Sequence, residues 1–442
     1  MSNNLKEKIH RLLDLSKNLG CQDVSVIGRE STSLNVTARL GNLENVERNE
    51  SKSIGLRLIH EKKQVTVSST DLSEEALDKL AHNALAMVKF VPEDPYCGLP
   101  EKSELYNGNT NLDLVDNYVP NNQDLLNKAL ATEESALNIA GITNSEGSSY
   151  SYSKSKFYLN SSNGFDNYFT RTNYSAGISV IAGEGTKMER DYEYQSKIHI
   201  KDLDSPEEIG KIAGERAISR LNPKKVKSDS VPVIFDPKVS GSLLSLLIGG
   251  ISGKAVARGT SFLKDKIQNN IFNKNINIID DPLIPRGPRS RIFDSEGVKT
   301  SKINIVEKGK LLSWILDSNT ARQLKMKSTG HAAGSPPIPS ASNIYIEPGT
   351  IKNNDLLKSI KNGFYITEMM GMSFNEVTGD YSRGATGFWI KDGEKVYPVS
   401  EVTVAGNILD MYKSITPASD LKFMTGIDAP TLMIDNMTVA GL

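Results

Sequence analysis

The chain has few of the residues on which several classes of protein depend. Its 442 residues include only two cysteines, and 52 lysines and arginines nearly cancel 53 aspartates and glutamates. Two cysteines, Cys21 and Cys97, cannot build a disulfide framework, so we expect a protein of a reducing compartment. Because there is no basic excess, we do not expect a nucleic-acid-binding protein that relies on phosphate contacts.

Long hydrophobic runs are also absent. The longest one, residues 243–251, is too short to span a bilayer, so we expect no membrane association. Residues 1–13 carry charges where a secretory signal would need an apolar core. We therefore expect a cytoplasmic protein.

The few histidines are too dispersed to suggest a metal site. The chain has five, at positions 10, 60, 82, 199 and 331, and no two lie close enough to form a ligand pair on one helix. Zinc takes three or four protein ligands, so a lone histidine is more often structural. We expect no metal or other cofactor in this chain.

Length and patterning predict an α/β fold of two domains. We expect a mixed α/β domain over residues 1–222 and a β-rich domain of mostly antiparallel sheet over 228–442, joined by a lysine-containing linker. In the first domain, the patterns predict separate strands at 24–27, 34–40 and 54–58, several antiparallel strands over 148–200, and a capping box of Asp71 with Glu74.

The second domain opens with a strand at 231–235 and the stretch 240–263, which we expect to form a helix that runs into a polar end at 258–261. Its apolar residues recur at helical spacing, which predicts burial against a sheet: Leu243, Leu247 and Ile251. Three glycines interrupt the helix, at roughly 1 kcal/mol each relative to alanine. We expect close backbone packing or a distorted turn to explain Gly249, Gly250 and Gly253.

Two catalytic motifs in this stretch are incomplete. Residues 249–254 resemble a phosphate-binding loop, but the motif is one residue short and Ala255 stands where magnesium needs a hydroxyl. Ser252 lacks the Gly-x-Ser-x-Gly setting of a nucleophile elbow. We therefore expect neither a nucleotide site nor a serine nucleophile here, and interpret Ser252 as a packing residue.

Residues 253–263, Gly-Lys-Ala-Val-Ala-Arg-Gly-Thr-Ser-Phe-Leu, resemble the PmbA (TldE) branch of the TldD/PmbA peptidase family. Several separate segments in the same order support the resemblance: 280–282, 286–288, 293–297, 328–331, 378–385, 387–390 and 401–407. The likeness covers essentially the whole chain and is densest after Pro223.

The resemblance implies that the catalytic motif of the family is missing. In the TldD branch the corresponding helix carries His-Glu-x-x-x-His, and these residues fall on Leu244, Ser245 and Gly249 here. Leucine and glycine cannot bind zinc, and serine is not a carboxylate base. The TldD branch also uses a cysteine near its C-terminus, whereas no cysteine follows Cys97.

The resemblance further implies a TldD/TldE-type metallopeptidase that trims leader peptides and degrades unfolded peptides. Zinc and hydrolysis would belong to a TldD-type partner, and this chain would shape the peptide tunnel without activity of its own. Two alternatives stay open: a stand-alone peptidase or peptide-binding homodimer, and a structural scaffold without peptide contact.

Two glycine-flanked polar segments are the best candidates for peptide contact. Glycine lets a backbone approach closely, and arginine can bind a carboxylate or a peptide carbonyl. The candidate substrate-binding residues are Arg258, Gly259, Thr260, Ser261, Arg383 and Gly384, with His331 as a weaker one. The alternative for both segments is loop architecture with an arginine paired to a neighbouring acid.

Overall fold

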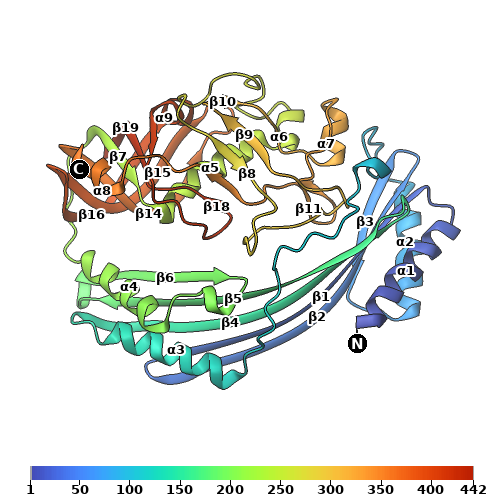
Figure 1. The fold of residues 1–442 in the computed structure, drawn as a ribbon, viewed down its shortest axis with the longest axis horizontal. Coiled ribbons are helices and arrows are strands. Elements are labelled where there is room, and N and C mark those ends of the chain that lie inside the picture. The colour runs from blue at the N-terminus through green and yellow to red at the C-terminus, as the bar shows by residue number, and fades with distance from the viewer. Residues whose placement is uncertain (1, 442) are drawn as a thin grey trace.

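The computed structural model describes residues 2–441 and has two halves, each built on its own sheets (Figure 1). It confirms the α/β class: helices pack on a long antiparallel sheet in the N-terminal half, and the C-terminal half is β-rich. Among the described residues, no helix is both long and apolar enough to cross a membrane.

The N-terminal half is built on one six-stranded sheet. Its strands are β1 (Asp23–Arg39), β2 (Asn42–His60), β3 (Lys63–Ser69), β4 (Ile142–Ser161), β5 (Asp166–Ala182) and β6 (Glu189–Lys197). Their order is β3-β2-β1-β4-β5-β6, and every neighbouring pair is antiparallel.

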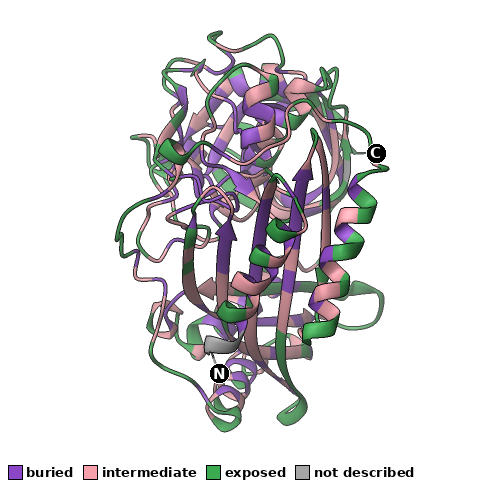
Figure 2. Cartoon of the chain, turned by 90° about the vertical axis from the view of Figure 1, so that its right-hand side faces the viewer, coloured by how far each residue is buried: buried purple, intermediate pink, exposed green. Residues whose placement is uncertain are grey.

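Four helices cover one face of this sheet, hereafter the outer face. They are α1 (Ser2–Asn18), α2 (Glu74–Val88), α3 (Asn122–Leu137) and α4 (Pro206–Ser219). Even-numbered positions of β1 point to this face: Val24 and Val26 pack in the core under α1 and α2, and Val36 in the core under α3 and α4. Figure 2 shows buried and intermediate residues along the strands and exposed residues on the helices.

The C-terminal half packs on the opposite, inner face. Phe293 lies in a small core with Ile27 and Leu159, and its ring stacks edge-on against Phe169 at 5.5 Å between centroids. A buried ion pair joins Arg57 of β2 to Glu296 at 3.0 Å.

Two sheets form most of the C-terminal half. The larger has the order β16-β15-β14-β7-β19-β17, and β16 also pairs with β19, so the sheet closes on itself. Its strands are β7 (Asp229–Phe235), β14 (Asn362–Phe374), β15 (Asp380–Lys391), β16 (Glu394–Asn407), β17 (Ile415–Pro417) and β19 (Leu432–Ala440). The smaller contains β8 (Ile278–Asp280), β9 (Ile303–Glu307), β10 (Lys310–Leu311), β13 (Ile344–Ile346) and β18 (Ile427–Asp428).

Short elements complete the fold. The helices are α5 (Pro237–Ile251), α6 (Gly253–Ala257), α7 (Ser318–Gln323), α8 (Asn353–Lys358) and α9 (Ile408–Ser414), and β11 (Ala332–Ala333) pairs with β12 (Ile338–Pro339). Three single turns of 3₁₀-helix lie at Lys102–Glu104, Gly185–Lys187 and Ile200–Asp202. Most sheet pairing in this half is antiparallel, as expected; β7 with β14 and β13 with β18 are parallel.

Three local predictions were wrong. The separate strands expected at 24–27 and 34–40 are one strand, β1, because its polar middle pairs with both β2 and β4. The single helix expected to run to the polar end at Arg258 is two helices, α5 and α6, separated at Ser252. The N-cap of α2 is Ser73, whose hydroxyl accepts from the N–H of Ala76, while Asp71 accepts from the N–H of Ser73.

Candidate functional site

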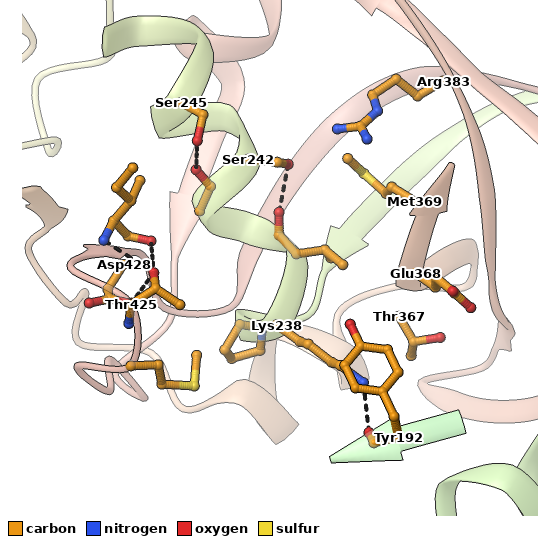
Figure 3. A pocket seen from close by; sticks show the side chains of 15 residues that line it. Tyr192, Lys238, Ser242, Ser245, Thr367, Glu368, Met369, Arg383, Thr425 and Asp428 are labelled. Carbon is orange, nitrogen blue, oxygen red and sulfur yellow. Dashed lines mark hydrogen bonds between the residues drawn. The ribbon is translucent and has the colours of Figure 1, made fainter. Parts of the chain in front are cut away.

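The helix α5 organises the candidate site because its sequence gives it one buried and one exposed side. Asp236 caps its first turn by accepting from the N–H of Lys238 at 2.9 Å, and Pro237 supplies the first helical residue. Its apolar side is fully buried: Leu243, Leu244, Leu247 and Ile251. Ser242 and Ser245 lie on the side that faces a cavity (Figure 3).

The glycines of this stretch permit close packing. A Cβ on Gly250 would lie 2.7 Å from the ring of Phe262, and one on Gly253 would lie 2.6 Å from Leu316. Between the helices, the N–H of Gly253 donates to the carbonyl of Ile315 at 2.8 Å, which breaks the helix at Ser252. Close packing therefore explains two of the three glycines, whereas a Cβ on Gly249 would meet open space.

A cavity of about 400 Å³ opens beside the first turns of α5. Its lining comes from both halves of the molecule: Tyr192 of β6; Pro237, Lys238, Val239, Gly241, Ser242 and Ser245 of α5; Thr367, Glu368 and Met369 of β14; Arg383 of β15; and Met424, Thr425, Ile427 and Asp428 at and before β18. Figure 3 shows Arg383, Glu368 and Lys238 around this space.

Charged groups at this cavity are paired across the two halves. The ammonium of Lys238 lies 3.1 Å from Asp191 of β6 and 3.6 Å from the centroid of the Tyr192 ring. Burial lowers the pKa of Lys238. Burial alone would raise the pKa of Asp191, but Lys238 and Arg220 outweigh it and hold that pKa below its usual range. Arg220 also binds Glu368 at 2.5 Å.

The hydroxyl groups at the cavity are not arranged for nucleophilic catalysis. Ser242 donates to the carbonyl of Val239 at 2.6 Å, and Ser245 donates to the carbonyl of Gly241 at 3.2 Å. The described residues that line the cavity include no histidine or cysteine that could serve as a base or nucleophile. The arrangement suits binding through hydrogen bonds and charge.

Arg383 reaches this cavity from β15. Its Nε donates to the carbonyl of Gly371 at 2.9 Å, which anchors one edge of the guanidinium. The neighbouring Gly384 pairs with Met370 of β14, and a Cβ there would make only an ordinary contact with the carbonyl oxygen of Met370, at 3.4 Å.

Arg258 lines a different cavity, of about 510 Å³, so the structure does not bring the two arginines together. This cavity lies between the two halves and is lined by residues that include Arg57, Asp94, Lys254, Glu296 and Asp317. The three residues after Arg258 end α6. Gly259 takes a φ of +72°, the N–H of Thr260 donates to Ala255, and the buried hydroxyl of Ser261 donates to the carbonyl of Gly250 at 2.6 Å.

His331 is fully buried, away from both cavities. One ring nitrogen lies 3.0 Å from the carboxylate of Asp280, and the other lies 2.7 Å from the carbonyl of Thr329. The carboxylate of Asp280 also accepts from the N–H of Ser342 at 2.8 Å. This geometry favours a structural role for His331 over contact with a peptide.

The sequence analysis missed the charged residues that shape the first cavity. Lys238, Asp191 and Glu368 lie on α5, β6 and β14, and only the fold brings them together. No local pattern marks them; the one available signal is that Lys238 follows Pro237 at the start of an apolar helix.

The α5 residues at the positions of the zinc motif cannot bind a zinc ion. Leu244 is 1% exposed within the core, and Gly249 has no side chain. Across residues 2–441, no group of three or more histidine, cysteine, aspartate or glutamate side chains is arranged to hold a metal ion.

Family models and relatives agree on what this fold is. The models of PmbA/TldA metallopeptidase domain 1, central domain and C-terminal domain match residues 24–88, 118–221 and 228–441. The Metalloprotease PmbA of Escherichia coli O157:H7 is 35% identical over 440 residues, covering 99% of this chain and 96% of the relative. The Metalloprotease PmbA homolog of Haemophilus influenzae is 33% identical, with 99% and 96% covered.

Solved structures share the whole fold. A proposed modulator of DNA gyrase from Bacteroides thetaiotaomicron superposes with a TM-score of 0.92 at 27% identity, covering 99% of both chains. The TldE of Thermococcus kodakarensis has the same fold, with a TM-score of 0.87 at 21% identity, covering 98% of this chain and 100% of the other.

The chain therefore belongs to the PmbA/TldA metallopeptidase family. Its full-length identity to PmbA metalloproteases assigns it to the PmbA/TldE branch. The family models divide the chain into three parts, and our division at 222–228 stays a prediction.

Proposed function

We propose that this chain is the PmbA/TldE-type subunit of a TldD/TldE metallopeptidase complex. In this role it binds a zinc-bearing TldD-type subunit, contributes part of the path along which a peptide reaches the active site, and leaves hydrolysis to its partner. The observation that carries the proposal is the state of α5, the helix that in the TldD branch holds the zinc motif.

Each position of that motif is unsuited to catalysis here. Leu244 packs in the core, Ser245 donates its hydroxyl to a carbonyl of its own helix, and Gly249 has no side chain. A zinc peptidase needs three protein ligands, an open coordination position and a general base. These residues supply none of the protein groups, so they support a non-catalytic role.

The cavity beside α5 supports a binding role. It offers cationic and anionic groups, Arg383 and Glu368, within a space of about 400 Å³. A peptide main chain presents both donors and acceptors, and a mixed lining can bind them without demanding one sequence. This is consistent with a complex that trims leader peptides and degrades unfolded peptides in the cytoplasm.

Zinc content and turnover of the purified chain test the proposal. We expect elemental analysis to find no stoichiometric zinc and a panel of unstructured peptides to remain uncleaved. The alternative, a stand-alone peptidase or a peptide-binding homodimer with its own activity, predicts turnover by this chain alone. Chelator-sensitive cleavage by material free of any TldD-type chain would reject the non-catalytic role.

A further inference from the structure

The inner face of the N-terminal sheet carries a block of uncharged polar side chains. The strand register places Ser33, Ser153 and Asn173 in one row across β1, β4 and β5, and Asn35, Ser151 and Ser175 in the next. These four serines and two asparagines, hereafter called the hydroxyl patch after the serines, all have intermediate exposure.

The patch lies between two contacts that the C-terminal half makes with this face. On one side, Arg171 belongs to the adjoining row and donates to the carbonyl of Pro288 at 2.6 Å. On the other side, Lys238 of α5 donates to the carbonyl of Tyr192 at 3.0 Å, and Tyr192 lines the cavity beside α5. The patch therefore lies on the same face of the sheet as the cavity beside α5.

Neither solvation nor strand propensity explains this composition. A solvated protein surface carries roughly 25–35% charged residues, whereas the patch and the next row, with Thr37 and Ser149, carry none; the nearest charge along these rows is Glu47 of β2, opposite Asn35 at the edge of the patch. Strand propensity favours valine, isoleucine, threonine and aromatic residues rather than a run of serines. Cross-strand hydrogen bonds account for part of the patch, because the hydroxyls of Ser151 and Ser175 lie 2.5 Å apart and Ser196 donates to Asn173 at 2.8 Å. The remaining serines of β4, at 149, 153 and 155, require another explanation.

The chemistry of the patch matches the main chain of an extended polypeptide. Serine hydroxyls and asparagine amides both donate and accept hydrogen bonds, and such residues give adaptable polar contacts in other binding surfaces. Successive patch residues on one strand are two positions apart, a spacing of about 6.4–6.8 Å. The N–H and C=O groups on one side of an extended peptide repeat at the same distance. Each main-chain group of the peptide can therefore lie opposite one patch side chain.

We propose that the hydroxyl patch binds extended polypeptide segments through their main-chain N–H and C=O groups, without selecting a sequence, and leads them toward the cavity beside α5. The choice of an unfolded peptide as the ligand rests on the proposed function. The absence of charge on the patch argues against a ligand recognised by its own charge.

Peptide binding by the full chain, measured by fluorescence anisotropy, tests this assignment. The probe is a labelled twelve-residue peptide of glycine, alanine and serine, compared with the same peptide N-methylated at alternate residues, which removes main-chain donors. Each lost hydrogen bond contributes about 0.5–1.5 kcal/mol, so we expect alternate methylation to weaken binding about tenfold or more.

Substitutions at one position separate main-chain recognition from charge recognition. We expect Ser153→Glu and Ser153→Arg each to weaken binding about fivefold or more, because either charge must be desolvated against a neutral main chain. Ser153→Asn, which keeps a donor and an acceptor, should bind within about twofold of the parent. The matched control is Lys154→Glu on the outer face of the same strand, where binding should also stay within about twofold.

Four results would overturn the assignment: no measurable binding of the unmethylated probe, equal binding of the methylated probe, unchanged binding in both charged Ser153 variants, or tighter binding with one sign of charge. Loss of assembly with a TldD-type chain at unchanged peptide affinity would instead make the face a subunit interface. The measurement needs neither zinc nor partner, so failure of the heterocomplex would remove the proposed function and leave this result standing.

Discussion

At the scale of single residues, α5 separates the two positions at which a zinc-binding helix would carry its histidines. Residues five apart on a regular helix point about 140° away from each other. In agreement, Leu244 is buried in the core and Gly249 is exposed on the other side. Side chains at these two positions cannot converge on one metal ion while the helix keeps its regular geometry.

Introducing the missing motif should therefore fail to create a peptidase. We expect the triple variant Leu244→His, Ser245→Glu, Gly249→His to lose about 2–5 kcal/mol of unfolding free energy, the range for truncating a large core residue. It should bind zinc weakly at most, because no cysteine follows Cys97 in the sequence to supply the third ligand. Chemical denaturation and zinc titration measure both effects.

The control for that variant keeps the buried leucine. Ser245→Glu with Gly249→His changes only exposed positions, so its stability should lie within about 1 kcal/mol of the parent. Tight tetrahedral zinc binding with peptide hydrolysis in the triple variant would show that the ligand positions on α5 are misassigned.

The two candidate arginines should act separately because they line different cavities. In the assembled complex, we expect Arg383→Ala and Arg258→Ala each to lower kcat/KM about tenfold, the effect of losing a charged hydrogen bond of about 1.5 kcal/mol. Assembly should persist, and the double variant should combine the two losses additively.

Arg48→Ala is the matched control for the arginine variants, because Arg48 is exposed and pairs only with Glu50 among the described residues. Its kcat/KM should equal that of the parent. Unchanged kinetics in both Arg258→Ala and Arg383→Ala would show that these arginines have only a structural role in their loops.

The candidate site could be predicted from the sequence only where a local pattern marks it. Glycine-flanked Arg383 and Arg258 were selected from their segments, and both line cavities. His331 was selected in the same way, but its burial depends on Asp280, which lies 51 residues away along the chain. Lys238 and Asp191 are 47 residues apart, so only the fold reveals their pairing.

At the scale of elements, the break between α5 and α6 follows from close packing at specific glycines. Gly250 approaches Phe262, and Gly253 approaches Leu316 and Thr320, at distances that leave no room for a Cβ. The hydroxyl of Ser261 then returns to the carbonyl of Gly250, which fixes the loop after α6 against the end of α5.

Alanine substitutions at these glycines should change the stability of the protein in opposite directions. Gly249→Ala should stabilise the protein by about 0.5–1 kcal/mol, because its Cβ meets open space and alanine favours the helix. Gly250→Ala and Gly253→Ala should each cost about 1–3 kcal/mol through overpacking. Denaturant titration measures all three; destabilisation by Gly249→Ala would contradict the packing described for α5.

The elements themselves were predictable where periodicity is strong. The strand at 231–235 and the apolar spacing of the following helix match β7 and α5. The centre of β1 was missed because Arg29 to Ser33 show no apolar alternation; pairing with β2 and β4 on both sides satisfies their backbone instead. At α2, Ser73 rather than Asp71 caps the helix. The carboxylate of Asp71 instead accepts from the N–H of Ser73, just before the helix begins.

At the scale of the whole molecule, a few charged contacts join the two halves beside the cavities. Asp191 binds Lys238 and Arg220 binds Glu368 at the first cavity, and Arg57 binds Glu296 at the second. Both cavities therefore depend on the relative placement of the curved sheet and the C-terminal half (Figure 1).

The solution mass of this chain with a TldD-type chain from the same cells tests the proposed partnership most directly. An obligate interface buries on the order of 2,000 Å² or more, and the net charge of −1 sets no strong electrostatic barrier to association. Light scattering during size-exclusion chromatography of the co-expressed pair should show one species with the mass of one copy of each chain. Two separate peaks at micromolar concentration, with this chain alone or as its own dimer, would contradict the account.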